Sequence, residues 1–319
     1  MTVCIAGICS WGPGAGQTAI AICDRMITTA DLQFEPDQPK MFFLNARVGA
    51  LIAGSGSAQT SICTAVQKRV AELGDWDDAS VSVQDVADLF AQELAAYRLR
   101  HAEQIYLRPL GIDAVSFMAN QTTYAPQFVQ DTIASIQNYD IGDMQTIIMG
   151  ADQKGPRLFH IDKWGNIRCD DLTAFSAIGI GEWHATSHLM LAKYSKNTTF
   201  QSALLQIYLA KRKAEAAPGI GRTTDIFFIS EDGISTLRSG VQDILKACVD
   251  EMEARIAPLT EEAEISFRTQ VDAFLEAANQ TPSEIERTKS QIEDSVDAND
   301  TMPKVTESND AEEPTEAKN

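Results

Sequence analysis

The order of apolar patterns along the chain constrains its fold more strongly than any single motif does. Short apolar runs that favour β-strands come first, two segments with helical spacing follow, and the same alternation then occurs a second time. The predicted strands are at 3–9, 19–23, 40–44, 48–53, 146–151, 157–161, 174–180, 224–230 and 234–237. The predicted helices are at 57–73, 82–99, 183–195 and 199–214, and residues 108–140 are predicted to be irregular. This order predicts an α+β fold, a four-layer αββα sandwich in which two antiparallel sheets lie between two helix layers.

The composition changes beyond residue 238. Apolar residues keep helical spacing from Val241 to Met252 and again from Phe267 to Ala278, and no aromatic residue follows Phe274. Residues 282–319 contain eleven acidic and four basic side chains, a net charge of −7. We therefore predict a main domain over 1–238, a helical extension over 239–295 and a disordered acidic tail over 296–319.

Charge and cysteine content limit the classes of protein to which the chain can belong. The formal net charge is −19 and the isoelectric point is near 4.5, whereas nucleic acids and anionic membranes are bound by clustered Lys and Arg. We therefore expect no nucleic-acid partner and no membrane. The six cysteines form no C-x-x-C pair, and the first residues lack the basic stretch and long apolar core of a secretory signal. We expect a cytoplasmic protein with reduced thiols.

Thr2 is a candidate nucleophile because it follows the initiator methionine. A threonine at this position is small enough for methionine aminopeptidase, so we expect Met1 to be removed and Thr2 to become the first residue. A hydroxyl is a weak nucleophile unless a base lies next to it. A free α-amine, with an ordinary pKa of about 7.7–8.0, can act as that base on the same residue. Many chains begin with Met-Thr, so this feature alone indicates little.

Several polar and glycine residues follow Thr2 at defined spacings. They are Asp24-Arg25, Thr28, Lys40 and Ala53-Gly54-Ser55. Sixteen positions separate Asp24 from Lys40, and fourteen separate Lys40 from Gly54. This pattern resembles the N-terminal segment of proteasome β-subunits and of the related peptidase of the bacterial two-component ATP-dependent protease. The resemblance implies the N-terminal-nucleophile (Ntn) hydrolase fold and the activity of a threonine peptidase or amidase.

The resemblance implies a role for each matched residue. Thr2 would be the nucleophile, and the positive charge of Lys40 beside it would favour the deprotonated hydroxyl and amine. Asp24 would supply the carboxylate that holds and orients Lys40. Gly54 would donate its backbone N–H to the tetrahedral oxyanion. Thr28 would align the substrate as an added strand through backbone hydrogen bonds.

A substrate pocket is also implied by the resemblance. The residues carried over to the pocket for the residue before the scissile bond are Ile27, Gln38, Phe42, Ile52 and Gly56. Most of this set is apolar, so we expect an apolar side chain to be preferred there.

The second half of the chain departs from the family pattern at two places. Residues 175–181 match a Gly-Ser-Gly segment, but Ile180 stands at the serine position. Residues 216–221 match a segment that usually holds an Asp and a Ser, and this chain has neither there. The two side chains that tune the amine are therefore absent, unless Thr223, Thr224 or Asp225 replaces them. We expect slow turnover from these substitutions.

The resemblance also suggests partners and alternatives. The substrate would be a polypeptide or peptide, and the chain would form a homo-oligomeric ring; no unfoldase or adaptor can be named. A first alternative is a catalytically inactive, proteasome-like scaffold subunit. A second is an amidase of the same fold that acts on non-peptide substrates.

Three other features look like functional motifs. Glu182, His184 and His188 fall on one predicted helix, but a zinc site would need a further ligand and a general base. The segment 12–18 is glycine-rich but lacks the lysine of a phosphate-binding loop, so it predicts a hairpin turn. Cys4 lies in a strand that would point it into the core. We expect no metal and no cofactor.

Overall fold

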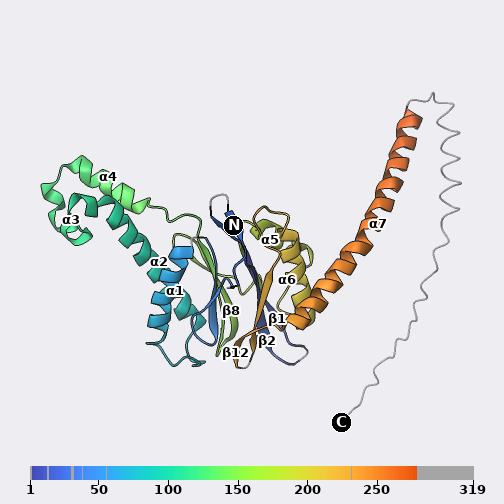
Figure 1. Ribbon diagram of the computed structural model, residues 1–319, viewed down its shortest axis with the longest axis horizontal. Helices are drawn as coiled ribbons and strands as arrows, with labels where there is room; N and C mark the ends of the chain where they lie inside the picture. The colour runs from blue at the N-terminus through green and yellow to red at the C-terminus, as the bar shows by residue number, and fades with distance from the viewer. Residues whose placement is uncertain are drawn as a thin grey trace, which may run out of the picture. The chain divides into compact units, whose positions relative to one another are not determined.

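Two five-stranded antiparallel sheets face each other at the centre of the computed structural model (Figure 1). The structure describes residues 2–278 apart from residues 13, 30, 31, 38, 55 and 231. The first sheet has the order β10 (Phe175–Gly179), β1 (Val3–Ser10), β2 (Gln17–Asp24), β11 (Thr224–Ser230) and β12 (Gly233–Thr236). The second has the order β5 (Met41–Phe43), β6 (Val48–Ala53), β7 (Gln145–Asp152), β8 (Gly155–Ile161) and β9 (Ile167–Cys169). The predicted α+β class with two antiparallel sheets is confirmed.

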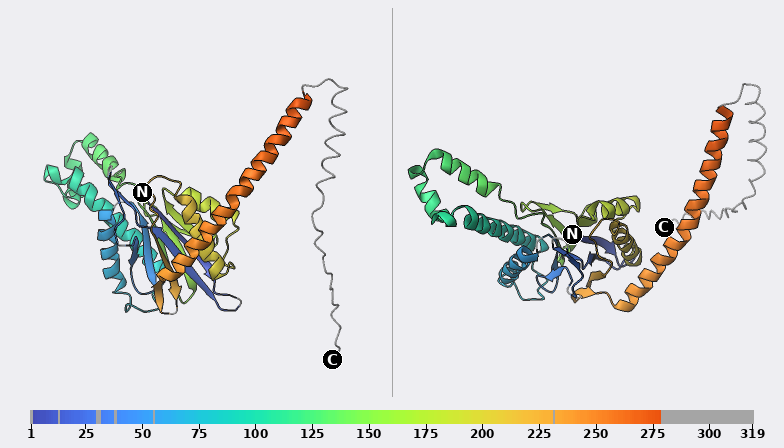
Figure 2. Two further views of the ribbon diagram at one scale, coloured as in Figure 1. Left: turned by 45° about the vertical axis from the view of Figure 1, so that its right-hand side comes forward. Right: turned by 45° about the horizontal axis from the view of Figure 1, so that its top comes forward.

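Helices cover the outer face of each sheet (Figures 1 and 2). The helices α1 (Gly56–Val70) and α2 (Val83–Tyr106) pack on the second sheet through a shared apolar core. The helices α5 (Glu182–Leu191) and α6 (Phe200–Ala214) pack on the first sheet in the same way. A third core fills the space between the two sheets and draws side chains from both. Each sheet is therefore buried on both faces.

Burial on both faces explains why the central strands read as continuous apolar runs. In β1, Cys4 and Ile8 face the second sheet, whereas Val3 and Ile5 face α5 and α6. The strand β1 pairs with β2 so that Cys4 lies opposite Cys23. This register brings the start of β1 beside the end of β2, and it thereby joins the two chain segments that carry Thr2 and Asp24.

The prediction that residues 108–140 are irregular is wrong. The helix α2 continues to Tyr106, and two short 3₁₀-helices (Arg108–Leu110, Gln121–Thr123) alternate with α3 (Ala114–Asn120) and α4 (Pro126–Gln137). We call residues 108–138 the helical lobe. Its small core is an aromatic cluster of Phe117, Tyr124 and Phe128, with ring centroids 5.6–6.2 Å apart. The helix α3 has seven residues, which is too few for a clear apolar period, whereas α4 has twelve residues and an amphipathic pattern that was not recognised in the sequence.

Two further elements were not predicted. A small separate hairpin is formed by β3 (Ile27–Thr29) and β4 (Leu32–Phe34), which pair with Thr28 opposite Gln33. The strand β9 adds an edge to the second sheet. Each of these strands has three residues, which is too short for a pattern of alternating side chains to stand out.

The C-terminal extension begins as a single helix, α7 (Ser239–Ala278), where the sequence suggested two segments. Pro258 lies inside it and cannot donate to the carbonyl of residue 254. Residue 254 is exposed, so water can satisfy that carbonyl.

The chain divides into two compact units between Val249 and Asp250. In the first unit, Leu245 and Val249 are buried in the core that covers the first sheet, so this unit extends past the predicted boundary at residue 238. In the second unit, residues 250–278 are the rest of α7, where Ile256 and Phe267 are among the exposed apolar side chains. The predicted tail at 296–319 lies outside the described residues.

Candidate active site

Thr2 lies immediately before β1, at the edge of the space between the two sheets. It is 7% exposed, and the next residue, Val3, is opposite Gly179 of β10 in the sheet. The backbone N–H of Val3 donates to Asp24 Oδ1 at 3.0 Å. The start of β1 is thus fixed by the sheet on one side and by the Asp24 carboxylate on the other.

Lys40 links Thr2 to Asp24. Its Nζ donates to Thr2 Oγ1 at 2.6 Å, to Asp24 Oδ1 at 2.9 Å and to the carbonyl of Met26 at 2.5 Å. An ammonium has three N–H donors, so all of them are used. The side chain of Lys40 is 11% exposed and that of Asp24 is fully buried, so solvent screens this ion pair little. Because Lys40 donates to Thr2 Oγ1, the threonine hydroxyl hydrogen must point toward another acceptor.

The Asp24 carboxylate accepts four hydrogen bonds. Oδ1 accepts from Val3 and Lys40, and Oδ2 accepts from the backbone N–H groups of Met26 and Gly221, each at 3.0 Å. Two bonds on each oxygen use the full capacity of an ionised carboxylate. Asp24 therefore has a fixed orientation, and its hydrogen bond to Lys40 Nζ fixes the position of that ammonium.

Gly54 follows β6 and lines the same cavity as Thr2. Its φ of +129° lies in a region that only glycine adopts without strain. A Cβ at this position would also collide with the backbone carbonyl of Asp143. Both the conformation and the close approach of the 143–144 backbone therefore require a glycine here.

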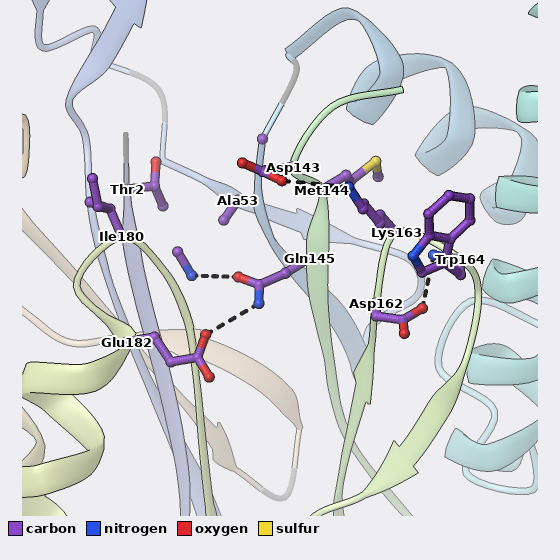
Figure 3. A pocket seen from close by; sticks show the side chains of 12 residues that line it. Thr2, Ala53, Asp143, Met144, Gln145, Asp162, Lys163, Trp164, Ile180 and Glu182 are labelled. Atoms are coloured by element: carbon purple, nitrogen blue, oxygen red, sulfur yellow. Dashed lines mark hydrogen bonds and ion pairs between the residues drawn. The ribbon is translucent and has the colours of Figure 1, made fainter. Parts of the chain in front are cut away.

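The cavity beside Thr2 has a volume of about 590 Å³ (Figure 3). Gln145 spans its floor: Oε1 accepts from the Gly179 N–H at 2.8 Å, and Nε2 donates to Glu182 Oε2 at 3.2 Å. The lining is of mixed polarity and comes from both sheets. It comprises Thr2, Ala53, Gly54, Asp143, Met144, Gln145, Asp162, Lys163, Trp164, Gly179, Ile180 and Glu182.

The predicted pocket residues do not line this cavity. Ile52 is buried against α1 and α2, with Phe42 packed on the same core. Ile27 is partly exposed in β3, and Gly56 opens α1. Thr28 lies in β3, and Gln38 is outside the described residues. The proposed apolar preference therefore stays a prediction.

Sequence reasoning missed most of the cavity wall. Asp143 and Gln145 follow the helical lobe, and Asp162 to Trp164 form the turn after β8. These segments carry no motif. The pairing of β7 with β6 and with β8 places them at one edge of the second sheet, and the packing of the two sheets brings that edge next to Thr2. In the sequence, Glu182 was considered only as a metal ligand, whereas in the structure it accepts a hydrogen bond from Gln145 Nε2.

The residues that could have replaced the missing auxiliary groups are bonded elsewhere. Asp225 accepts from both Arg25 Nε and Nη2, at 2.8 and 2.6 Å. The hydroxyl of Thr223 donates to Glu35, and that of Thr224 donates to the carbonyl of Arg222. Ile180, at the serine position, is 45% exposed and lines the cavity. The wall beside Thr2 is therefore apolar at the position where the resemblance to proteasome β-subunits led us to look for a hydroxyl.

Cys4 is buried near Thr2. A hydrogen bond to the thiol of Cys23, together with burial, raises the pKa of Cys4 well above its ordinary value. Because the thiolate is the reactive form of cysteine, this environment makes Cys4 unreactive. Within the described residues no group of three or more His, Cys, Asp or Glu could hold a metal ion.

No protein-family model and no curated protein sequence matches this chain. None of the helices in the described part of the chain is long and apolar enough to cross a membrane.

Proposed function

We propose that this chain is an Ntn hydrolase of the proteasome β-subunit type that cleaves peptide or related amide bonds with Thr2. The observation that carries this proposal is the line of contacts from Thr2 Oγ1 to Lys40 and on to Asp24. A threonine with only a structural role would not need a buried ammonium 2.6 Å from its hydroxyl oxygen. Burying such a charge is costly, and here its carboxylate partner is fully buried as well.

The proposed reaction begins once the residue before Thr2 has been removed and its amine is free. Thr2 Oγ1 attacks the substrate carbonyl carbon while its proton passes to that amine. The Gly54 N–H would donate to the resulting oxyanion. The protonated amine then gives its proton to the leaving nitrogen as the C–N bond breaks, which leaves an acyl ester on Thr2. Water, deprotonated by the amine, attacks this ester; the bond from the acyl carbon to Thr2 Oγ1 then breaks, the amine returns its proton to Oγ1, and the acid and the free enzyme are released.

Lys40 and Asp24 would act without exchanging protons with the substrate. The charge of Lys40 stabilises negative charge that develops on Thr2 Oγ1 during attack. Its position is fixed because Asp24 and the Met26 carbonyl hold its other two N–H groups. Preorganisation of this kind lowers the barrier because the site need not rearrange during the reaction.

A catalytically inactive scaffold is the second candidate, and it is favoured by Ile180 and by the engaged side chains of Thr223 and Asp225. Hydrolysis of fluorogenic peptide amides separates the two. We expect slow but measurable turnover in the wild type, retained in part by Thr2→Ser and lost in Thr2→Ala. Measurable and equal release by the wild type and Thr2→Ala would contradict the nucleophile, and no release by the wild type would favour the scaffold.

A further inference from the structure

Lys211 on α6 is a fully buried lysine that contacts none of the hydrogen-bonding atoms of Thr2, Lys40 and Asp24 directly. Its side chain is 0% exposed. Nζ donates to Glu215 Oε1 at 2.6 Å, to the carbonyl of Gly221 at 2.8 Å and to the carbonyl of Arg222 at 2.9 Å. All three N–H donors are therefore used, and two of them are committed to consecutive backbone carbonyls of one loop.

That loop reaches the proposed catalytic site through Gly221. The Gly221 carbonyl accepts from Lys211, and the Gly221 N–H donates to Asp24 Oδ2 at 3.0 Å. One residue thus connects the buried lysine to the carboxylate that orients Lys40. Lys211 also lies close enough to Asp24 for their charges to interact.

The backbone of Gly221 must be restrained by other residues if its N–H is to stay directed at Asp24. Glycine has more backbone freedom than any other residue, so its N–H direction is poorly fixed by the chain itself. A Cβ at position 221 would meet the Glu35 carboxylate and lie 3.0 Å from Met26 Cβ, so a side chain there would force both neighbours to shift. The freedom of Gly221 must therefore be restrained by contacts from outside the loop.

Two contacts supply restraint, and they differ in strength. Glu35 accepts from the N–H and the hydroxyl of Thr223, but Glu35 is exposed and its bonds compete with water. The contact of Lys211 with the Gly221 carbonyl is buried, so its loss would leave that carbonyl without a donor, whereas the Arg222 carbonyl would keep only the Thr224 hydroxyl. Lys211 is the stronger of the two restraints.

We propose that Lys211 is a positioning residue for the Thr2 site: by holding the Gly221 and Arg222 carbonyls, it keeps the Gly221 N–H on Asp24 and so keeps Lys40 aligned with Thr2. This inference rests on the proposed function. It differs from a purely structural role in one respect. A structural ion pair would be broken equally by changing Lys211 or Glu215, whereas positioning depends on the carbonyl contacts, which Lys211 makes and Glu215 does not.

The test is the rate at which a peptide-like β-lactone acylates the full-length protein, followed by intact mass spectrometry. Saturation with lactone concentration separates the maximal rate of acylation from the half-saturating concentration. We expect Lys211→Met to lower the maximal rate at least about 10-fold, because small displacements of catalytic groups cost up to about 100-fold. The half-saturating concentration should stay within about 2-fold, since Lys211 does not line the cavity.

Two matched variants complete the design. Lys213→Met removes an exposed lysine from the same helix and should leave the rate unchanged. Glu215→Gln breaks the ion pair but keeps the carbonyl contacts, so its rate should fall less than that of Lys211→Met. If Lys211→Met does not fold, Lys211→Gln takes its place, with an intermediate fall in rate expected.

The outcomes are distinct. A wild type that is not acylated at Thr2 rejects the proposed function, and the inference falls with it. An acylated wild type with an equal rate in the folded position-211 variant overturns the inference alone. Equal falls in Glu215→Gln and the position-211 variant also overturn it, because they would indicate an ion pair with a structural role only.

Discussion

At the scale of single residues, the site consists of buried charges held by backbone groups. Asp24 is surrounded by four donors, Lys40 by three acceptors and Lys211 by three acceptors. A buried charge is tolerated only when such partners are present. The loss of one partner should therefore be costly, and this leads to two predictions.

Asp24→Asn should destabilise the protein by about 3 kcal/mol, because it leaves the Lys40 ammonium buried without its counterion. It also turns an amide donor toward backbone N–H groups. Denaturant unfolding measures the change. Glu93→Gln is the control, since the Arg69–Glu93 pair at 3.1 Å is partly exposed on the Arg69 side and should contribute at most about 1 kcal/mol. Equal losses in both variants would contradict the account.

The stability contributed by Lys211 should depend on pH. Burial lowers the pKa of Lys211 from its ordinary value of 10.5, against the opposing influence of Glu215 and Asp24 and with a smaller contribution from Arg212. Between the folded pKa and 10.5 the unfolded chain binds more protons, so stability rises with pH. The stability of the wild type relative to Lys211→Met should therefore increase as pH rises toward 10.5. A falling difference would contradict the direction of the shift.

At the scale of elements, long patterns were predictable and short ones were not. The strands β1, β2, β6 and β7 are buried on both faces, so their apolar runs stood out in the sequence. The helical lobe, β3, β4 and β9 are short and were missed. The candidate site was predictable only where its residues are close in sequence. The spacing between Thr2 and Gly54 predicted Lys40 and Asp24. The residues Gln145, Glu182 and Lys211 are distant in sequence, and strand pairing and helix packing bring them to the site.

The helical lobe should depend on its aromatic cluster. Phe117→Ala removes the buried ring of that cluster and should destabilise the lobe by about 3 kcal/mol. Amide hydrogen exchange should then accelerate in α3 and α4 while the two sheets keep their protection. Val115→Ala, at an exposed position of α3, should change stability by no more than about 0.5 kcal/mol. Loss of protection throughout the sheets would show that the lobe is not a separate folding unit.

At the scale of the whole molecule, we propose that the chain forms a homo-oligomer. The apolar stripes of α1 and α2 do not supply a surface for this assembly, because Val66 and Phe90 are buried against the second sheet. Exposed apolar side chains lie instead on α5, where Met190 and Leu191 follow Trp183 by about two helical turns.

Light scattering at micromolar concentration tests this assembly. The wild type should have a mass several times that of one chain, and the double variant Met190→Glu with Leu191→Glu should shift toward the monomer because it places charges at these exposed positions. A wild type with monomer mass would contradict the proposed assembly, although the chemistry at Thr2 could still hold within one chain.

The central claim is that Thr2 is the nucleophile, and the most direct measurement is to map the residue that a β-lactone modifies. Intact mass spectrometry first reports whether Met1 is removed, and peptide mapping then locates the added acyl group. The account predicts a free amine at Thr2, one acyl group per chain on its hydroxyl, and no modification in Thr2→Ala. A blocked or extended Thr2, or an acyl group that remains in Thr2→Ala, would contradict it.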